Sequence, residues 1–300
     1  MVTFWRGSKA QLVAGRAVLV GFPQDEGVRR NGGRPGAAAA PNEIRRWLYR
    51  LTAADAAADI DLALRPPVDL GNLRIRGSLE ETQKALGQVV AALLDRGAIP
   101  IVLGGGHETA FGHYLGYAHQ RRSVGIINID AHLDVRPLRE GFGHSGSPFR
   151  QAMEHAEHPL PGSRYACLAA QPHGVSRQHR DFVQQRGGVI RWRTEPGFHL
   201  LSAWEEEHDR LARQGIPIMQ TIDADAVCVA DVPGVSAPNP AGIPGCAVLA
   251  CARRAGESPA VASLDLVEVN PDFDLDGRSA RWAALVIWQF LVGLQVRPGI

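Results

Sequence analysis

The sequence has few cysteines, almost no net charge and no long hydrophobic run. Its four cysteines, in a chain of 300 residues, form no CxxC pair, which argues against a disulfide framework and indicates free thiols in a reducing compartment. The formal charge of +1 gives no basic excess to neutralise phosphates. These two shortages exclude a small disulfide scaffold and argue against a general nucleic-acid binder.

Apolar segments long enough for a bilayer are also missing. The longest run near the end, WAALVIWQFLVGL at 282–294, contains Gln289 and falls short of the about 20 apolar residues that a spanning helix needs. The first residues, MVTFWRGSKAQLVAGR, lack the apolar core and small-residue cleavage site of a signal peptide. We therefore expect a soluble, cytoplasmic protein without a membrane partner.

What is present is a large apolar fraction arranged in alternating patterns. Hydrophobic residues make up 45% of the chain, and the length suits a single α/β domain over residues 1–300. Buried strands are expected at 17–22, 99–104, 124–130, 164–170, 188–192, 216–223 and 261–269. Helices are expected at 42–51, 78–97, from about 108, and near 176–186, 199–214, 243–255 and 279–294. This alternation predicts a mostly parallel sheet with helices on both faces, and ligands then bind beyond the carboxyl ends of the strands.

Polar side chains with metal-ligand chemistry follow two of these strands at every second position. The stretch NIDAHLD places Asp130, His132 and Asp134 on one face of an extended segment. The stretch TIDADA repeats the spacing with Asp223 and Asp225. A solvated strand end explains either stretch alone, so the interpretation depends on what the other strand ends carry.

A third strand end carries three glycines followed by His107, in VLGGGHETA. A dinucleotide-binding turn fits poorly, because its glycine spacing requires glycine at Thr109. A fourth strand ends at Glu268, in SLDLVEVNP, where a buried carboxylate needs a partner such as an arginine or a ligand. Together, four aspartates balance two divalent cations, and a set rich in oxygen with some imidazole suits manganese better than zinc.

The glycine-turn histidine, D-A-H-x-D and D-x-D motifs, in this order, resemble the arginase/agmatinase ureohydrolase family. The resemblance spans nearly the whole chain and implies a three-layer α/β/α fold with an eight-stranded, mostly parallel sheet. It implies a cluster of two Mn²⁺ ions held by His107, Asp130, His132, Asp134, Asp223 and Asp225. By the same resemblance, Asp130 and Asp223 bridge the metals, Glu268 binds the substrate amidine, and the protein forms a homo-oligomer.

Within that family the chain looks most like the formimidoylglutamase branch. The stretches DEGVRRNGGRPGA, SGSPFRQ, PGVSAP and DLDGRSAR support this. Arginases and agmatinases usually carry a histidine where this chain has Ser145, and His144 is offset by one residue. The branch implies hydrolysis of N-formimidoyl-L-glutamate to L-glutamate and formamide, a step of histidine degradation.

Charge considerations agree with an amidine substrate. A hydroxide between the two metals is expected to attack the C=N carbon, with Asp134 orienting it and carrying a proton to the leaving amine. That hydroxide and Glu268 leave the reacting end about two units negative, which suits a cationic amidinium. The glutamyl carboxylates need arginines, and our candidates are Arg136, then Arg30 and Arg34, with Ser145 nearby.

Three alternatives remain. A guanidino-compound hydrolase acting on agmatine, guanidinobutyrate or arginine and releasing urea would share the metal site. A metal-binding protein without turnover has no need for the extra carboxylate of Glu268. A nucleotide-binding oxidoreductase lacks its glycine spacing.

Overall fold

The central element is a nine-stranded sheet, and every strand pair in it is parallel. The computed structural model of the chain describes residues 2–4 and 12–299, so much of the segment tested above for a signal peptide lies outside the described residues. Across the sheet the strands run in the order β1 (Thr3–Phe4), β5 (Val68–Asn72), β2 (Ala17–Phe22), β6 (Ile99–Gly104), β11 (Val261–Val267), β10 (Ile218–Asp223), β7 (Gly125–Ile129), β8 (Tyr165–Ala170) and β9 (Val189–Trp192).

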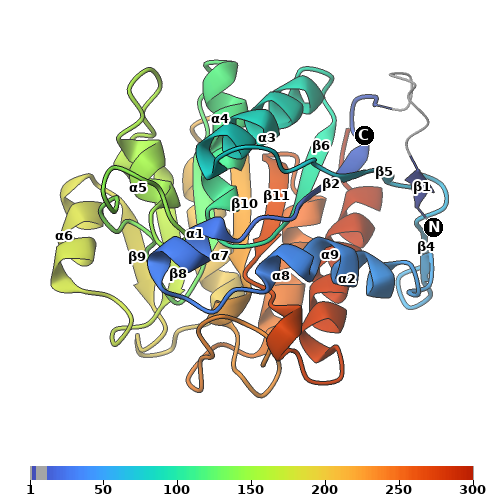
Figure 1. The fold of residues 1–300 in the computed structure, drawn as a ribbon. Helices are drawn as coiled ribbons and strands as arrows, with labels where there is room; N and C mark the ends of the chain where they lie inside the picture. The colour runs from blue at the N-terminus through green and yellow to red at the C-terminus, as the bar shows by residue number, and fades with distance from the viewer. Residues whose placement is uncertain (1, 5–11, 300) are drawn as a thin grey trace.

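Helices cover both faces of this sheet, which gives the three layers seen in Figure 1. One face packs against α2 (Ala40–Leu48), α7 (Leu200–Ala212), α8 (Gly245–Glu257) and α9 (Arg278–Gln295). The other packs against α3 (Leu79–Leu94), α4 (Thr109–His119), α5 (Pro148–Met153) and α6 (Arg177–Gln185). The predicted α/β/α fold is confirmed. Seven of the nine strands lie where the sequence predicts them. The other two, β5 and the two-residue edge strand β1, were not located from the sequence, nor was the short helix α5, and the sheet has one strand more than the eight that the resemblance implies.

Strand β2 illustrates why the sheet is buried on both sides. All six of its residues are buried, and alternate side chains point to opposite faces. Val18 and Val20 join the core beneath α3 and α4, whereas Ala17 and Leu19 join the core beneath α2 and α9. A near-continuous apolar run of this kind is typical of a central parallel strand.

Helix boundaries follow the local capping chemistry. Ser78 accepts a hydrogen bond from the backbone N–H of Glu81, and the Glu81 carboxylate accepts one from the backbone N–H of Ser78. This reciprocal pair starts α3 where the sequence predicts it. The expected helix at 42–51 instead begins at Ala40, so that Pro41 occupies the first turn, where it needs no hydrogen-bond partner.

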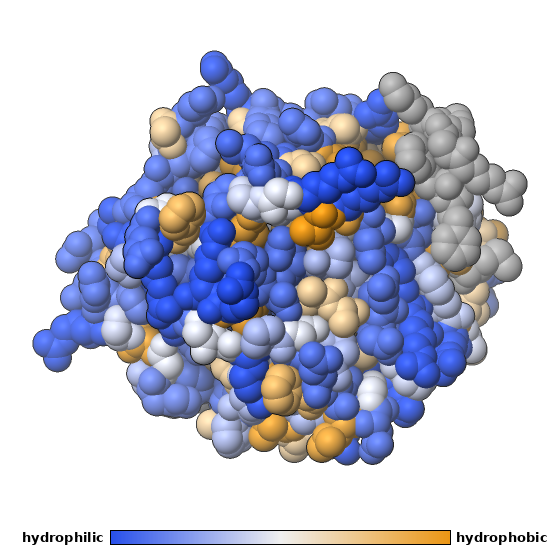
Figure 2. Space-filling model, in the orientation of Figure 1, coloured by the Kyte–Doolittle hydropathy of each residue, from blue (hydrophilic) through white to orange (hydrophobic). Residues whose placement is uncertain are grey.

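The remaining elements are short and were not expected. They are α1 (Glu26–Asn31), the antiparallel pair β3 (Ala54–Asp55) and β4 (Ile60–Asp61), and the 3₁₀ turns η2 (Ala37–Ala39), η3 (Gly162–Arg164), η4 (Ala224–Ala226) and η5 (Pro271–Phe273). On the face drawn in Figure 2, apolar side chains are scattered over a mostly hydrophilic surface. Within residues 2–4 and 12–299, no helix combines the length and hydrophobicity that a membrane span requires.

Candidate functional site

Four neighbouring strands in the middle of the sheet end at the same edge, and each delivers a predicted site residue there. These strands are β6, β11, β10 and β7, in that order across the sheet. After β6 the chain crosses to β7 and continues outward through β8 and β9. It then returns to the middle of the sheet, where β10 and β11 lie between β7 and β6. A crevice at such a change of direction is where open α/β sheets bind ligands.

The glycine turn after β6 sets the position of His107. A Cβ atom on Gly105 would lie 2.0 Å from the backbone oxygen of Gln24, and one on Gly106 would lie 2.1 Å from Oε2 of Glu108. Neither glycine has a positive φ angle. The glycines are therefore required here because other backbone and side-chain atoms approach closely, and not because the turn is left-handed.

His107 lies among three carboxylates in a fully buried position. Its Nδ1 atom is 2.9 Å from Oδ2 of Asp134, 3.0 Å from Oδ2 of Asp223 and 3.3 Å from Oδ2 of Asp130. The edge of the Phe149 ring packs against the imidazole, with centroids 5.3 Å apart. The ligand atoms of these four polar residues lie within 4.8 Å of one another, a spacing that could hold one metal ion.

A second group of potential ligands adjoins the first. Nδ1 of His132 is 3.2 Å from Oδ2 of Asp225 and 3.5 Å from Oδ1 of Asp130. Asp130 belongs to both groups, as a residue that bridges two metals must. Asp223 belongs only to the first, and its Oδ1 accepts a hydrogen bond from the backbone N–H of Asp225. The structure thus brings all six predicted ligands together in two groups that share one carboxylate.

Unpartnered buried atoms show that the donor set fits a pair of cations. Nδ1 of His107 and Oδ1 of Asp225 are buried without a hydrogen-bond partner, although carboxylate oxygens surround the histidine. Buried polar atoms normally have partners, so these two mark positions for a ligand. Six side chains with four carboxylates and two imidazoles match the oxygen-rich sites that manganese prefers.

The pKa shifts of the cluster residues in the absence of a cation also indicate a site for positive charge. Burial and the neighbouring charges of Asp225 and Asp130 raise the pKa of Asp223 well above its usual range. Burial lowers the pKa of His107, but its contacts with Asp130, Asp134 and Asp223 outweigh burial and raise the pKa well above the ordinary value. The Asp225 charge likewise raises the pKa of His132. Protons therefore balance part of the negative charge that divalent cations would otherwise neutralise.

Glu268 lies directly after β11 in a left-handed backbone conformation, with a φ angle of 65°. Its backbone N–H donates to the oxygen of Gly105 at 2.7 Å, and its Oε1 accepts from the backbone N–H of His107 at 2.8 Å. Among the described residues, no donor contacts Oε2. Burial and the charge of Asp223 raise the pKa of Glu268 well above its usual range. This carboxylate lies beside the cluster but is not a member of either ligand group.

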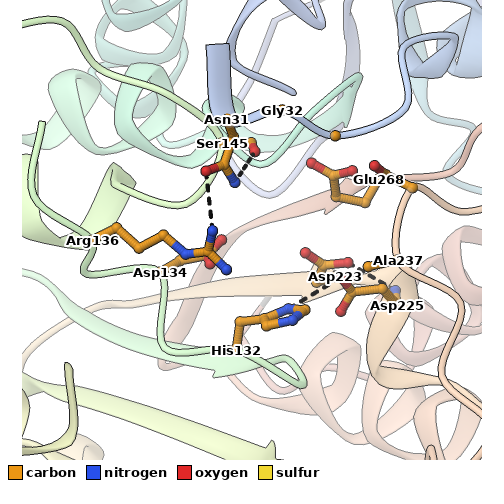
Figure 3. Close-up of a pocket in the computed structure, with 12 residues that line it drawn as sticks. Asn31, Gly32, His132, Asp134, Arg136, Ser145, Asp223, Asp225, Ala237 and Glu268 are labelled. Carbon is orange, nitrogen blue, oxygen red and sulfur yellow. Dashed lines mark hydrogen bonds and ion pairs between the residues drawn. The ribbon is translucent and has the colours of Figure 1, made fainter. Parts of the chain in front are cut away.

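A cavity of about 290 Å³ opens above the cluster. Asp223, Asp225 and Glu268 line one side of it, and Arg136, Asn31 and Ser145 line another, as Figure 3 shows. His132 and Asp134 also line the cavity. Nη1 of Arg136 donates to Oδ1 of Asn31 at 3.2 Å, and Nδ2 of Asn31 donates to Oγ of Ser145 at 3.1 Å. Within the described part of the chain, Arg136 has no carboxylate partner, so its charge is available to a ligand.

The structure does not bring Arg30 and Arg34 to this cavity. Arg30 pairs with Glu26 at 3.1 Å and with Glu80, and it also donates to the backbone oxygen of Gly143. Arg34 donates to the backbone oxygens of Ser236 and Val235 and lies over the ring of Phe273. Neither arginine lines the cavity, and both guanidinium groups already have partners within the protein.

His144 is also engaged elsewhere. Its Nε2 is 3.0 Å from the backbone oxygen of Pro137, and its Nδ1 accepts from the backbone N–H of Gly146 at 3.2 Å. With both ring nitrogens bound to backbone, His144 has no free nitrogen for a substrate. Asn31, which lies between the two expected arginines in the sequence, was not predicted as a site residue. Its polar amide at the end of a short helix, before two glycines, was the available signal.

Comparisons with known proteins agree with this geometry. The arginase family model matches residues 15–293. The chain is 39% identical over 283 residues to a formimidoylglutamase of Salmonella heidelberg, covering 91% of this chain and 84% of that protein. It is 37% identical over 277 residues to a formimidoylglutamase of Chromobacterium violaceum, covering 90% of this chain and 85% of that protein.

Solved structures also resemble it. The crystal structure of Trypanosoma cruzi formiminoglutamase with Mn²⁺ superposes with a TM-score of 0.88, at 32% identity and 97% coverage of both chains. The family match covers far more than half of the chain, and the relatives are matched over most of their length. This chain belongs to the arginase family.

Proposed function

We propose that this protein is a manganese-dependent hydrolase that converts N-formimidoyl-L-glutamate to L-glutamate and formamide. The observation that carries the proposal is the polarity of one cavity, which has a carboxylate cluster with Glu268 at one end and the cation Arg136 at another. N-formimidoyl-L-glutamate has the complementary polarity, with a cationic amidine at one end and two carboxylates at the other. The similarity to formimidoylglutamases supports the same substrate.

Two manganese ions would be held by the two ligand groups, with Asp130 common to both. When bound, they supply the positive charge that lets a water molecule ionise near neutral pH and act as a nucleophile. Burial and the charge of Asp223 raise the pKa of Glu268, and the charge of bound metal ions would offset the second cause and favour the carboxylate form beside the amidine.

Glu268 binds and orients the amidine in this proposal. Its Oε1 is fixed by the His107 N–H, which leaves Oε2 to accept from an N–H of the amidinium. A carboxylate at this end of the substrate would be repelled by Glu268 and the aspartates. The site therefore selects a cation for the reacting end.

Arg136 binds a carboxylate of the glutamyl portion. The Asn31 amide accepts from Arg136 and donates to Ser145, so it holds both side chains at the cavity wall. A guanidinium with free N–H groups suits bidentate recognition of a carboxylate. Arg30 and Arg34 are left out of this role because other groups already bind them.

Asp134 transfers a proton from the attacking water to the leaving nitrogen in this proposal. It lines the cavity, and its Oδ2 faces His107 while no described donor contacts its Oδ1. We assign Oδ1 to accept a proton from the attacking water and to deliver it to the leaving nitrogen. A C–O bond forms at the formimidoyl carbon, and the bond from that carbon to the glutamate nitrogen breaks as Asp134 protonates that nitrogen, which leaves as a neutral amine. The remaining hydroxyl proton is lost to solvent as the C=O bond of formamide forms, and the amine takes up a proton from solvent.

We also propose that the protein is cytoplasmic. All four cysteines are free thiols, which suits the reducing cytoplasm, and the reaction would belong to histidine degradation. A homo-oligomer built from this single domain is part of the same proposal.

The test is to supply Mn²⁺-loaded protein with N-formimidoyl-L-glutamate, agmatine, guanidinobutyrate and arginine, and to assay formamide and urea separately. We expect formamide from the first substrate alone, and its loss after chelation. Urea from a guanidino compound, without formamide, would move the function to a guanidino hydrolase. No product from any of them, with two metals bound, would overturn the assignment of a hydrolase.

A further inference from the structure

A second polar network lies beneath the metal cluster, on the side of His107 away from the cavity. All of its members are buried side chains, and none of them lines the cavity. They come from the neighbouring strands β10 and β11 and from α4, and they are Thr221, Asp265, Ser263, His113 and Tyr117.

One arm of this network starts at His107. Its Nε2 is 3.1 Å from Oγ1 of Thr221, and the Thr221 hydroxyl in turn donates to Oδ1 of Asp265. Thr221 and Asp265 are direct partners in the register of β10 and β11, so the sheet itself places them together. No other described residue donates to Oδ1 of Asp265.

The other arm reaches Asp265 from α4. Oδ2 of Asp265 is 2.6 Å from Nδ1 of His113, whose Nε2 is 2.7 Å from Oγ of Ser263. The hydroxyl of Tyr117 lies 2.6 Å from that same Oγ. Asp265 is thus a fully buried carboxylate held by donors on both oxygens.

Counting hydrogens along these contacts fixes the tautomer of His107. If the Thr221 hydroxyl donated to Nε2 of His107, Oδ1 of Asp265 would lose its donor inside the protein, and leaving a buried carboxylate oxygen without a donor is strongly unfavourable. The favourable direction therefore runs from His107 Nε2–H to Thr221, and from Thr221 O–H to Asp265. With one proton held on Nε2, Nδ1 is the nitrogen that can give up its proton to a metal ion, and it is the one that faces the three carboxylates.

We infer that Asp265, acting through Thr221, is a positioning residue that keeps His107 in the form that can ligate a metal ion. His113, Ser263 and Tyr117 hold Asp265 in place. His132, the ligand of the second group, has no described acceptor for its Nε2, so the two groups differ in this respect. The inference rests on the metal site of the proposed function and is independent of its substrate. Loss of a hydrogen bond to the second ring nitrogen of a metal-binding histidine typically weakens metal affinity by about 10–100-fold.

The test compares Mn²⁺ binding in three variants, with free Mn²⁺ measured by electron paramagnetic resonance. Thr221→Val keeps the branched shape and removes the hydroxyl, whereas Thr221→Ser keeps the hydroxyl. Thr82→Val is the matched control, because Thr82 is also buried but its hydroxyl donates to Leu79 in its own helix.

We expect Thr221→Val to bind one of the two ions roughly 10–100-fold more weakly and the other unchanged. Thr221→Ser and Thr82→Val should bind both ions as the wild type does. Two unchanged ions in folded Thr221→Val, or equal weakening of both, would overturn the inference. If wild-type protein binds no Mn²⁺, the proposed metal centre fails as well, so the two failures are distinct.

A measurement on the wild type keeps the inference testable if Thr221→Val does not fold. In Co²⁺-loaded protein, the ring N–H groups of the ligating histidines give hyperfine-shifted proton signals that exchange with solvent. We expect one slowly exchanging signal, from Nε2–H of His107, and one rapidly exchanging signal, from His132. Rapid exchange of both signals would overturn the inference.

Discussion

At the residue scale, two of the residues that line the cavity hold backbone conformations that side chains rarely adopt. Asp134 has a φ angle of 46° and Glu268 one of 65°. Conformations of this kind cost about 1–3 kcal/mol each and persist only where surrounding contacts impose them. For Glu268 those contacts are its hydrogen bonds to Gly105 and to the His107 N–H. The strained backbone thus occurs at two residues whose side chains must point into the cavity.

Arg136→Ala should weaken recognition of the glutamyl end without disturbing the metals. Losing charge-assisted hydrogen bonds of about 1.5–3 kcal/mol predicts a roughly 10–100-fold fall in kcat/KM for N-formimidoyl-L-glutamate, mainly through KM. A simple alkylformamidine, which lacks the carboxylates, should lose little. Arg139→Ala is the control, because Arg139 lies in the same loop but does not line the cavity. An equal loss with both substrates would contradict the role given to Arg136.

Glu268→Gln should impair turnover of every cationic amidine. The amide keeps an oxygen for the His107 N–H but removes the negative charge, so we predict a loss of about 2–3 kcal/mol, or roughly 30–150-fold in kcat/KM. Bound Mn²⁺ should remain at two ions per chain. Loss of a metal ion from this variant would instead make Glu268 a ligand.

At the element scale, the site depends on how closely the glycine turn after β6 packs against the loop after β2. The sequence pattern predicted the strand before this turn, the helix after it, and the alternation of ligands after β7 and β10, because period-two spacing encodes which side chains converge. It could not predict that Thr221 lies opposite Asp265, since that pairing depends on the register between β10 and β11. For the same reason, the contacts of Asn31 with Arg136 and Ser145 were not expected.

Gly105→Ala should damage both stability and metal binding. Its Cβ would meet the backbone oxygen of Gln24 at 2.0 Å and the carbonyl carbon at 2.8 Å, so rigid backbone must move. Overpacking of this kind costs about 1–3 kcal/mol. Thermal unfolding should show a Tm lowered by several degrees, about 2–4 °C per kcal/mol.

The control for that variant is Gly71→Ala, where the added Cβ meets no atom within 4 Å but the φ angle is 77°. It should lose only about 1–2 kcal/mol from the left-handed conformation and keep both Mn²⁺ ions. Normal metal content in Gly105→Ala would mean that the turn tolerates a side chain and does not set the position of His107.

At the scale of the whole molecule, metal binding and proton binding compete. Contacts with neighbouring carboxylates raise the pKa values of His107 and His132 in the metal-free protein, and any proton on Nδ1 must leave when that atom binds a metal. Because protons compete with the metal for these atoms, Mn²⁺ should bind more tightly as the pH rises and more weakly as the pH falls.

Calorimetric titration with Mn²⁺ in buffers of different ionisation enthalpy should therefore detect proton release, to which the two histidines and Asp223 contribute. His132→Ala should release fewer protons, because it lacks one of the two rings. A binding enthalpy that is the same in every buffer would contradict the raised pKa values.

Anomalous X-ray diffraction from Mn²⁺-loaded crystals, recorded at the manganese absorption edge, would locate the metal ions directly. We predict two peaks at the carboxyl edge of the central strands. One should lie among His107, Asp130, Asp134 and Asp223, and the other among Asp130, His132 and Asp225. A single peak, or peaks away from these side chains, would contradict a two-manganese centre built from four neighbouring strand ends.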